Sequence, residues 1–97
     1  MSVTIVKISI NDNGVLCLYP KGKTFEMIYR SAMGVHWNED ECFLYHNASI
    51  EWSPLQWYYQ IIKTVKNEYG IIFKIDSNII FENLDNNFIS EIGGELH

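Results

Sequence analysis

Alternating apolar and polar residues open the chain and predict a first β-hairpin. Over residues 3–10 the alternation has a period of two, which is typical of a half-buried strand. The asparagines, aspartate and glycine at 11–14 tolerate the left-handed backbone angles that a tight turn requires. We therefore expect the apolar run at 15–19, which ends before Pro20, to return beside the first strand.

Helical spacing replaces the strand pattern in the next segment. Thr24 is a candidate N-cap, and Gly34 stands where a left-handed residue commonly ends a helix. The apolar positions recur at i, i+3, i+4, i+7 and i+8, on one helical face, and they are Phe25, Ile28, Tyr29, Ala32 and Met33. The pattern predicts a helix over residues 25–33.

A second hairpin and a long helix are expected in the middle of the chain. Residues 35–37 and 42–46 have strand composition, and the polar segment 38–41 between them predicts a turn. Ser53, Pro54 and Gln56 then form a capping box with proline at the first helical position, and Gly70 stands at the far end. This combination predicts a helix over residues 54–69.

The last third of the chain predicts two strands and a short helix. Residues 71–75 and 79–82 are apolar runs joined by a tight polar turn, and we expect them to pair as an antiparallel ribbon. Phe88, Ile89 and Ile92 can form one face of a short helix that Gly93 and Gly94 end. Residues 93–97 are expected to be a frayed tail.

Together these elements follow the order ββαββαββα. We predict a single α+β domain over residues 1–97, with its ordered core at 3–92. Its antiparallel sheet of hairpins is expected to pack against one long amphipathic helix and two shorter helices.

Composition limits the classes of protein that this chain can represent. It has 97 residues, 47% of them apolar, and a net charge of −5, which fits one small acidic globular domain. No window approaches the ~18 consecutive apolar residues of a membrane span, and the amino terminus lacks a signal-peptide pattern. We expect a cytoplasmic protein without a membrane partner, in which Cys17 and Cys42 are buried, reduced thiols.

No residue pattern in the sequence predicts catalysis. His36 and His46 lie on different predicted strands and His97 is terminal, so their spacing matches no metal motif. The glycines form no phosphate-binding loop, and no signature assembles a catalytic triad. We predict a non-enzymatic protein without a cofactor or metal, and keep as a third hypothesis a small enzyme that uses His36 or His46 as a base.

The distribution of charge favours a basic partner. Acidic residues concentrate in 38–51 and 75–97, and neither segment contains a lysine or an arginine. The basic residues are scattered over several elements, so no basic face is available to neutralise the phosphates of a nucleic acid. We therefore expect a basic protein partner, or self-association as a homo-oligomer, and no nucleic acid.

Aromatic residues supply the candidate contacts. Trp37, Trp52 and Trp57 belong either to the core or to an interface, and Trp52 is placed either to staple Tyr58 or to pack beside Trp57. Arg30, the only arginine, can bind an anion, pair with an acidic side chain, which we favour, or anchor an interface.

We predict that the carboxylates Glu39, Asp40 and Glu41 steer the partner and that buried contacts then hold it. The residues expected to make those contacts are Trp37, Trp57 and Arg30. The alternative is a small-molecule module, in which an apolar pocket is lined by Tyr29, His36, Trp37 and Trp57.

Three segments of the chain resemble a family of small bacterial integron gene cassette proteins. They are IYRSAMGVHW at 28–37, WYYQII at 57–62 and EYGI at 68–71. This resemblance implies no activity. Trp52-Ser53-Pro54 and the segment YGIIF at 69–73 more weakly resemble small immunity proteins of polymorphic-toxin systems, which implies an acidic inhibitor of a basic toxin.

Overall fold

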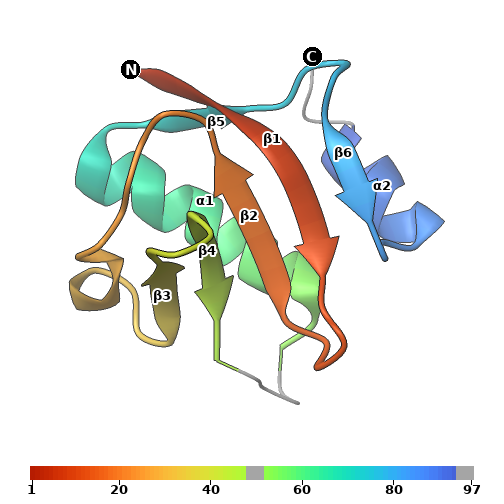
Figure 1. The fold of residues 1–97 in the computed structure, drawn as a ribbon, viewed down its shortest axis with the longest axis horizontal. Helices are drawn as coiled ribbons and strands as arrows, with labels where there is room; N and C mark the ends of the chain where they lie inside the picture. The colour runs from red at the N-terminus through yellow and green to blue at the C-terminus, as the bar shows by residue number, and fades with distance from the viewer. Residues whose placement is uncertain (48–51, 94–97) are drawn as a thin grey trace.

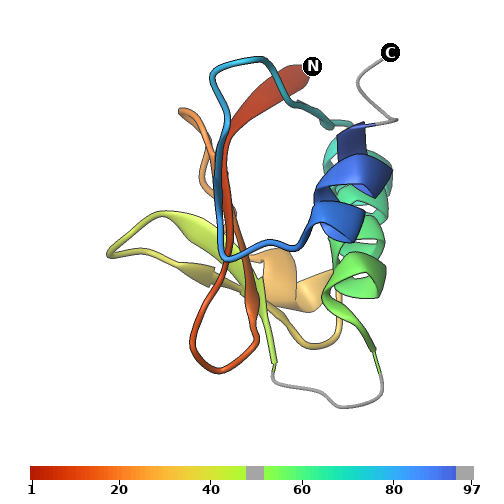
Figure 2. The same ribbon diagram turned by 90° about the vertical axis from the view of Figure 1, so that its right-hand side faces the viewer.

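One mixed sheet organises the chain in a computed structural model that describes residues 1–47 and 52–93. Its six strands run in the order β3-β4-β2-β1, and β5 and β6 both lie on the far side of β1 (Figure 1). The strands are β1 (Ser2–Ile10), β2 (Leu16–Pro20), β3 (Val35–Asn38), β4 (Phe43–His46), β5 (Ile72–Lys74) and β6 (Ile80–Glu82). The helices α1 (Pro54–Tyr69) and α2 (Asn86–Gly93) cover one face of this sheet (Figure 2).

The first hairpin is confirmed, and its turn is built by one asparagine. β1 and β2 pair antiparallel, with Ile10 opposite Leu16. The Asn11 side chain accepts hydrogen bonds from the backbone N–H groups of Asn13 and Val15, at 2.9 and 3.0 Å. Such local hydrogen bonds replace the ladder at the point where the chain reverses.

The predicted helix over residues 25–33 is wrong. Only a 3₁₀ turn, η1 (Ile28–Arg30), forms there, and no side chain caps its start. Phe25, Ile28 and Ala32 are buried, whereas Tyr29 and Met33, which the helical pattern placed on the same face, are 53% and 95% exposed. A segment this short is marginal as a helix, and one turn already delivers the three buried side chains to the core.

The second hairpin and the long helix are confirmed. Val35 on β3 lies opposite His46 on β4, and Trp37 lies opposite Leu44. The α1 capping box is complete, because Ser53 Oγ accepts from the Gln56 N–H at 3.3 Å and Gln56 Oε1 accepts from the Ser53 N–H at 2.8 Å. Gly70 ends α1 in the left-handed conformation, with φ of 65°.

The predicted antiparallel ribbon at residues 71–82 is also wrong. β5 pairs parallel with Ser2–Thr4, and β6 pairs parallel with Lys7–Ser9. The two strands therefore pair with successive parts of β1 and not with each other. Asp76 builds the expected tight turn by accepting the Asn78 N–H at 2.9 Å, but the chain does not reverse. β1 has nine residues and β2 uses one of its edges, so the other edge accepts both short strands. The sheet is therefore mixed, and the predicted order ββαββαββα does not hold.

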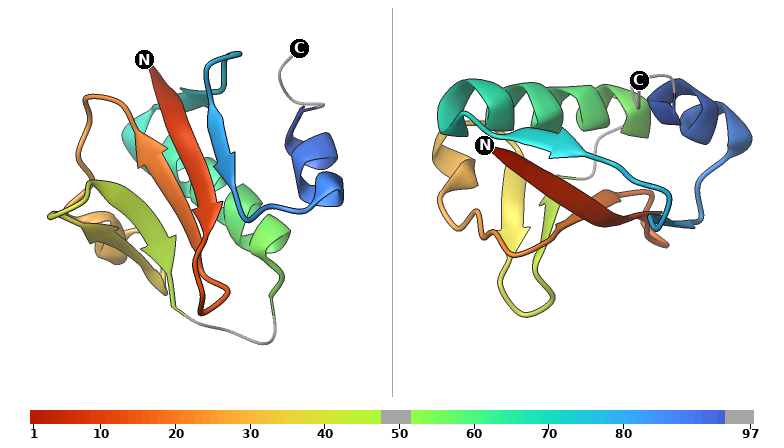
Figure 3. Two further views of the ribbon diagram at one scale, coloured as in Figure 1. Left: turned by 45° about the vertical axis from the view of Figure 1, so that its right-hand side comes forward. Right: turned by 90° about the horizontal axis from the view of Figure 1, so that it is seen from above.

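The core lies between the sheet and the helices, which form the two layers seen in Figure 3. Its fully buried side chains include Ile5 and Ile8 from β1, Leu44 from β4, and Ile61 and Val65 from α1. The predicted short helix is present as α2, and Asp85 Oδ1 accepts from the Phe88 N–H at 2.7 Å at its start. The expected frayed tail falls, for residues 94–97, outside the described residues.

The two cysteines lie in different surroundings. Cys17 on β2 is 3% exposed, and burial raises the pKa of its thiol. Cys42 is exposed and adopts a left-handed backbone, with φ of 61°, at the end of the turn between β3 and β4. The prediction of a buried thiol is therefore confirmed for Cys17 and wrong for Cys42, since residue 42 lies in the projecting turn.

Candidate functional site

The nine candidate binding residues lie in three separate parts of the fold. Tyr29 and Arg30 belong to η1, where both are exposed, and among the described residues Arg30 takes part in no ion pair. His36 and Trp37 belong to β3, and the acidic residues 39–41 form the turn that follows it. Trp52 and Trp57 lie at the start of α1. The fold therefore does not gather all nine residues into one site.

The tryptophans belong largely to the core. Trp57 is 7% exposed, and Trp37 is half-buried and meets the buried Phe25 edge to face, at 5.7 Å between ring centroids. Trp52 is 41% exposed, and its ring centroid lies 4.7 Å from that of Trp57. Of the two predicted positions, Trp52 therefore takes the one beside Trp57. Both side chains pack within the domain itself, and a contact of Trp37 or Trp57 with a partner stays a prediction.

His46 connects this tryptophan pair to the sheet. Its ring lies parallel to that of Trp57, with centroids 4.5 Å apart and planes 4° apart. Nε2 accepts the Leu16 N–H at 2.9 Å, and Nδ1–H donates to the Asn47 carbonyl at 2.7 Å. Burial lowers the pKa of His46, and the hydrogen bond to Asn47 opposes that change. Both nitrogens of the neutral ring are engaged, so His46 has none free to act as a base.

The face of the sheet opposite the helices carries a row of aromatic rings. Leu16, Leu18, Leu44 and His46 face inward, so the residues that alternate with them face outward. Adjacent centroids are 5.4 Å apart from His36 to Tyr45, 5.7 Å from Tyr45 to Phe43, and 5.0 Å from Phe43 to Tyr19. We call these four half-buried residues, His36, Tyr45, Phe43 and Tyr19, the aromatic row.

Lys7 and Glu82 continue the row at its β1 end. The Lys7 ammonium lies 5.1 Å from the centroid of the Tyr19 ring, in a cation–π contact. The same ammonium lies 3.1 Å from Glu82 Oε2 on β6. The hydrogen bond to Glu82 is the main cause of the raised pKa of Lys7.

The acidic turn lies next to Phe43, because Asn38 and Phe43 form the last residue pair of the β3–β4 hairpin before the turn. The turn closes through hydrogen bonds to Asn38, whose side chain accepts the Glu41 N–H at 2.9 Å and whose carbonyl accepts the Cys42 N–H at 2.8 Å. Glu39, Asp40 and Glu41 are exposed, and within residues 1–47 and 52–93 none of them forms an ion pair. The β3–β4 hairpin projects from the sheet on the side away from the helices (Figure 2).

The charge of Glu41 acts on the uncovered face. Burial is the main cause of the raised pKa of Tyr19, and Glu41 adds to the increase. Glu41 also contributes to the raised pKa values of Cys17, where burial dominates, and of Lys7, where Glu82 dominates. In all three side chains the contribution of Glu41 is minor beside the main cause.

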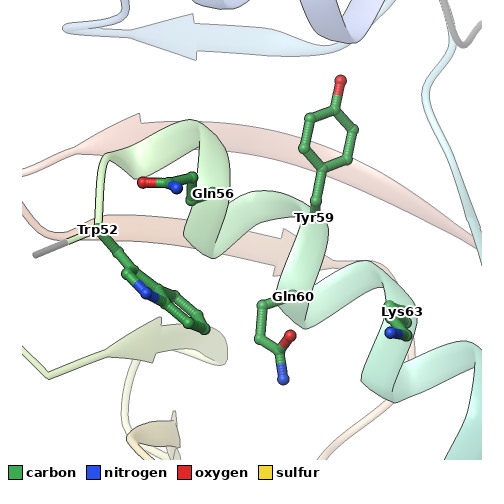
Figure 4. Close-up of a pocket in the computed structure, with 5 residues that line it drawn as sticks. All are labelled: Trp52, Gln56, Tyr59, Gln60 and Lys63. Carbon is green, nitrogen blue, oxygen red and sulfur yellow. The ribbon is translucent and has the colours of Figure 1, made fainter.

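Two hollows lie elsewhere. A shallow groove of about 320 Å³ follows the outer side of α1 (Figure 4), and its lining residues are Trp52, Gln56, Tyr59, Gln60 and Lys63. A second hollow of about 320 Å³ lies between the starts of the two helices, lined in part by Leu55 and Phe88. Tyr29, His36, Trp37 and Trp57, the side chains expected to line an apolar pocket, line neither hollow.

The described parts of the chain offer neither a metal-binding cluster nor a membrane-spanning helix. There, no group of three or more histidine, cysteine, aspartate or glutamate side chains is arranged to hold a metal ion. Neither helix in the same ranges has the length and apolarity to cross a membrane.

Only part of this face is predictable from the sequence. His36 and the acidic turn are among the predicted binding residues, whereas Lys7, Tyr19, Phe43 and Tyr45 are not. The available signal was the alternation within residues 15–19 and 42–46, in which every second residue of a strand faces the same side. Alternation alone does not identify these residues as a surface, because it does not show which side of the sheet the helices leave uncovered.

The fold and this face define a class: a small α+β domain whose mixed sheet is covered by helices on one side and carries aromatic residues on the other. A family model described as Integron Cassette Protein Hfx_Cass5 matches residues 3–78, and the chain belongs to this family. The predicted resemblance to integron gene cassette proteins is confirmed.

A solved structure of an integron cassette protein, Hfx_Cass5, from the mobile metagenome of the North West Arm sewage outfall is similar to this chain. The two are 32% identical over 97% of this chain and 90% of that one, with a TM-score of 0.47. Among curated proteins, no match was found.

Proposed function

We propose that this chain is a non-enzymatic protein-binding domain of a mobile bacterial element and that it recognises a basic partner protein in the cytoplasm. The observation that carries the proposal is the exposed acidic turn at 39–41, which lacks an ion-pair partner within the described ranges and borders the aromatic row. An accessory or immunity-type role, in which the partner is a basic toxin, is the form of this proposal that the weaker resemblance favours.

The turn and the row have different roles in this proposal. Exposed like charges attract an oppositely charged protein over distances near the Debye length and raise the rate of association. Aromatic rings at the centre of an interface contribute to its lifetime, because they bury a large area with little loss of side-chain entropy. The Glu39–Glu41 turn therefore governs the on-rate, and the row governs the off-rate.

Capture and kinetics test the proposal. The tagged chain is used to recover partners from lysate of its own host at low and at high salt, and native mass spectrometry weighs the products. We expect a stoichiometric, basic protein whose recovery falls at high salt. Recovery of the chain alone, as a monomer or a homo-oligomer, contradicts the proposal.

A charge-reversal variant then tests the turn. Replacing Glu39, Asp40 and Glu41 by lysine should slow association with the captured partner at low salt, with little effect on its dissociation. The control reverses three exposed acidic residues elsewhere, Asp12, Glu26 and Glu68, and so matches the change in net charge. An equal loss of on-rate in both variants would assign the effect to overall charge and remove the turn from the mechanism.

A second candidate is a small-molecule binding module, and the groove on α1 supports it. Its volume of about 320 Å³ lies at the lower end of the range for ligand sites, roughly 300–1,000 Å³. Trp52 and Tyr59 offer ring surfaces there, beside the amide of Gln60 and the ammonium of Lys63 (Figure 4). A ligand screen read by tryptophan fluorescence tests it, and a hit that survives Trp52→Ala unchanged places the ligand elsewhere.

A further inference from the structure

The uncovered face of the sheet already binds one cation, and that cation belongs to the protein itself. Lys7 lies over the Tyr19 ring at 5.1 Å and pairs with Glu82 at 3.1 Å. A ring face on one side and a carboxylate on the other form the combination that stabilises ammonium and guanidinium groups in proteins. At its β1 end, then, the row holds a charge of the sign that we expect from a basic partner.

The β4 residues in the middle of the row have the same chemistry without a cation of their own. Phe43 and Tyr45 are half-buried, and among the described residues no lysine or arginine lies over either ring. Glu41 stands two residues before Phe43, in the exposed turn that follows the Asn38–Phe43 pair of the hairpin. Aromatic rings and carboxylates are therefore present together here, and among the described residues no cation of the chain lies over these rings.

The rings also have a spacing that suits an extended chain. Phe43 and Tyr45 lie on one strand two residues apart, with centroids 5.7 Å apart. In an extended segment, side chains on the same side repeat every two residues, at about 6.6–6.8 Å. Basic residues at every second position of such a segment would thus meet successive rings.

We propose, as an extension that rests on the proposed function, that the partner presents an extended segment with arginine or lysine at every second position. The cations of these residues stack on Phe43 and Tyr45 beside the acidic turn. Lys7 over Tyr19 is the internal counterpart of this contact. Arginine suits the site better than lysine, because its planar guanidinium can stack on a ring while it donates hydrogen bonds to a carboxylate.

Charge argues against a nucleic acid on the same rings. Bases stack on aromatic platforms, but such platforms lie in positively charged grooves that follow the phosphates. Here the acidic turn adjoins Phe43 within the row, and at the β1 end Lys7 is already paired with Glu82. A phosphate backbone along the row would therefore meet carboxylates.

A peptide titration followed by NMR tests this proposal with the full chain. The probe is a short peptide with arginine at every second position, separated by threonine. One control replaces each arginine by citrulline, which keeps the shape and removes the charge, and another places the arginines side by side. We expect the ring resonances of Phe43 and Tyr45 to shift with the probe, weakly with adjacent arginines, and not with citrulline.

Substitutions then assign the contact. Phe43→Leu and Tyr45→Leu should each weaken binding of the probe about two- to fivefold, the range for an exposed cation–π contact. Tyr29→Leu, which removes an exposed ring on η1, should leave the affinity unchanged. Glu41→Gln keeps both rings in place and should also weaken binding, which covers the case in which a ring variant fails to fold.

The outcomes separate this inference from the proposed function. Equal binding of the citrulline peptide, tighter binding of oligothymidylate, or self-association of the chain through the row overturns the cation site. If the probe leaves the row unchanged while charge reversal at 39–41 still slows the natural partner, the proposed function stands and the inference fails. If neither measurement responds, both are wrong.

Discussion

Replacing His46 by leucine should lower the free energy of unfolding strongly, although His46 belongs to no proposed binding site. Its ring is 3% exposed, and its Nε2 is the acceptor for the Leu16 N–H. Leaving that buried N–H without an acceptor costs about 1–3 kcal/mol, and losing the ring stacked on Trp57 removes about 0.5–1.5 kcal/mol more. The sum is about 1.5–4.5 kcal/mol of unfolding free energy. Urea unfolding followed by circular dichroism measures it, with His36→Leu as the control.

The same contacts predict a pH dependence. Burial lowers the pKa of folded His46 below the ordinary value of 6.5, so between those two values the unfolded chain binds more protons. The stability that His46 contributes is therefore complete above about pH 6.5 and is lost as the pH falls through the folded pKa, by at most about 1.4 kcal/mol per pH unit. Protonation turns Nε2 into a donor that faces the Leu16 N–H.

Comparing wild type and His46→Leu at about pH 7.5 and about pH 5 isolates this contribution. The difference in unfolding free energy between the two proteins should shrink at the lower pH, because the variant has no imidazole to protonate. His36→Leu should lower the free energy of unfolding less than His46→Leu does, because His36 Nε2 bonds only the exposed Asn47 side chain, at 2.7 Å. A constant difference between wild type and His46→Leu at both pH values would refute the assignment of a neutral, buried acceptor.

Three further changes test the local devices of the fold. Gly34→Ala should lower the free energy of unfolding by about 2–3 kcal/mol, measured by thermal unfolding, because φ is +82° and the new methyl would lie 3.2 Å from the Trp57 ring. Gly22→Ala is the control: φ is +73° with open space around the new methyl, so the loss should be about 1 kcal/mol. Equal costs would dismiss the indole contact. Ser53→Ala removes the acceptor of the α1 capping box and should lower the free energy of unfolding by about 1 kcal/mol in urea; no change would mean that water caps the helix equally well. Ellman's reagent should label the exposed Cys42 at once and the buried Cys17, whose pKa is raised, only on unfolding; rapid labelling of both would contradict the burial of Cys17.

The candidate site illustrates a limit of reasoning from spacing. Helical periodicity put Trp57 at the edge of an apolar face, and only its contact with His46 shows that it belongs to the core. The sequence predicts Phe43 and Tyr45 only as strand residues, since alternation identifies two sides of a strand without saying which side is covered. The face is uncovered because both helices pack on the opposite side of the sheet (Figure 2).

By itself the sequence determined the elements whose hydrogen bonds close within a few residues: the Asn11 turn, the Ser53 capping box and the Gly70 terminus. Those bonds depend on neighbours in the chain, so a local pattern is sufficient to predict them. Tertiary structure decided the rest. β5 and β6 pair with β1 because it offers a free edge, residues 25–33 form one turn because the core requires only three of their side chains, and the aromatic row lies open because both helices pack on the opposite face. Each of these outcomes depends on residues distant in the chain, which local spacing does not encode.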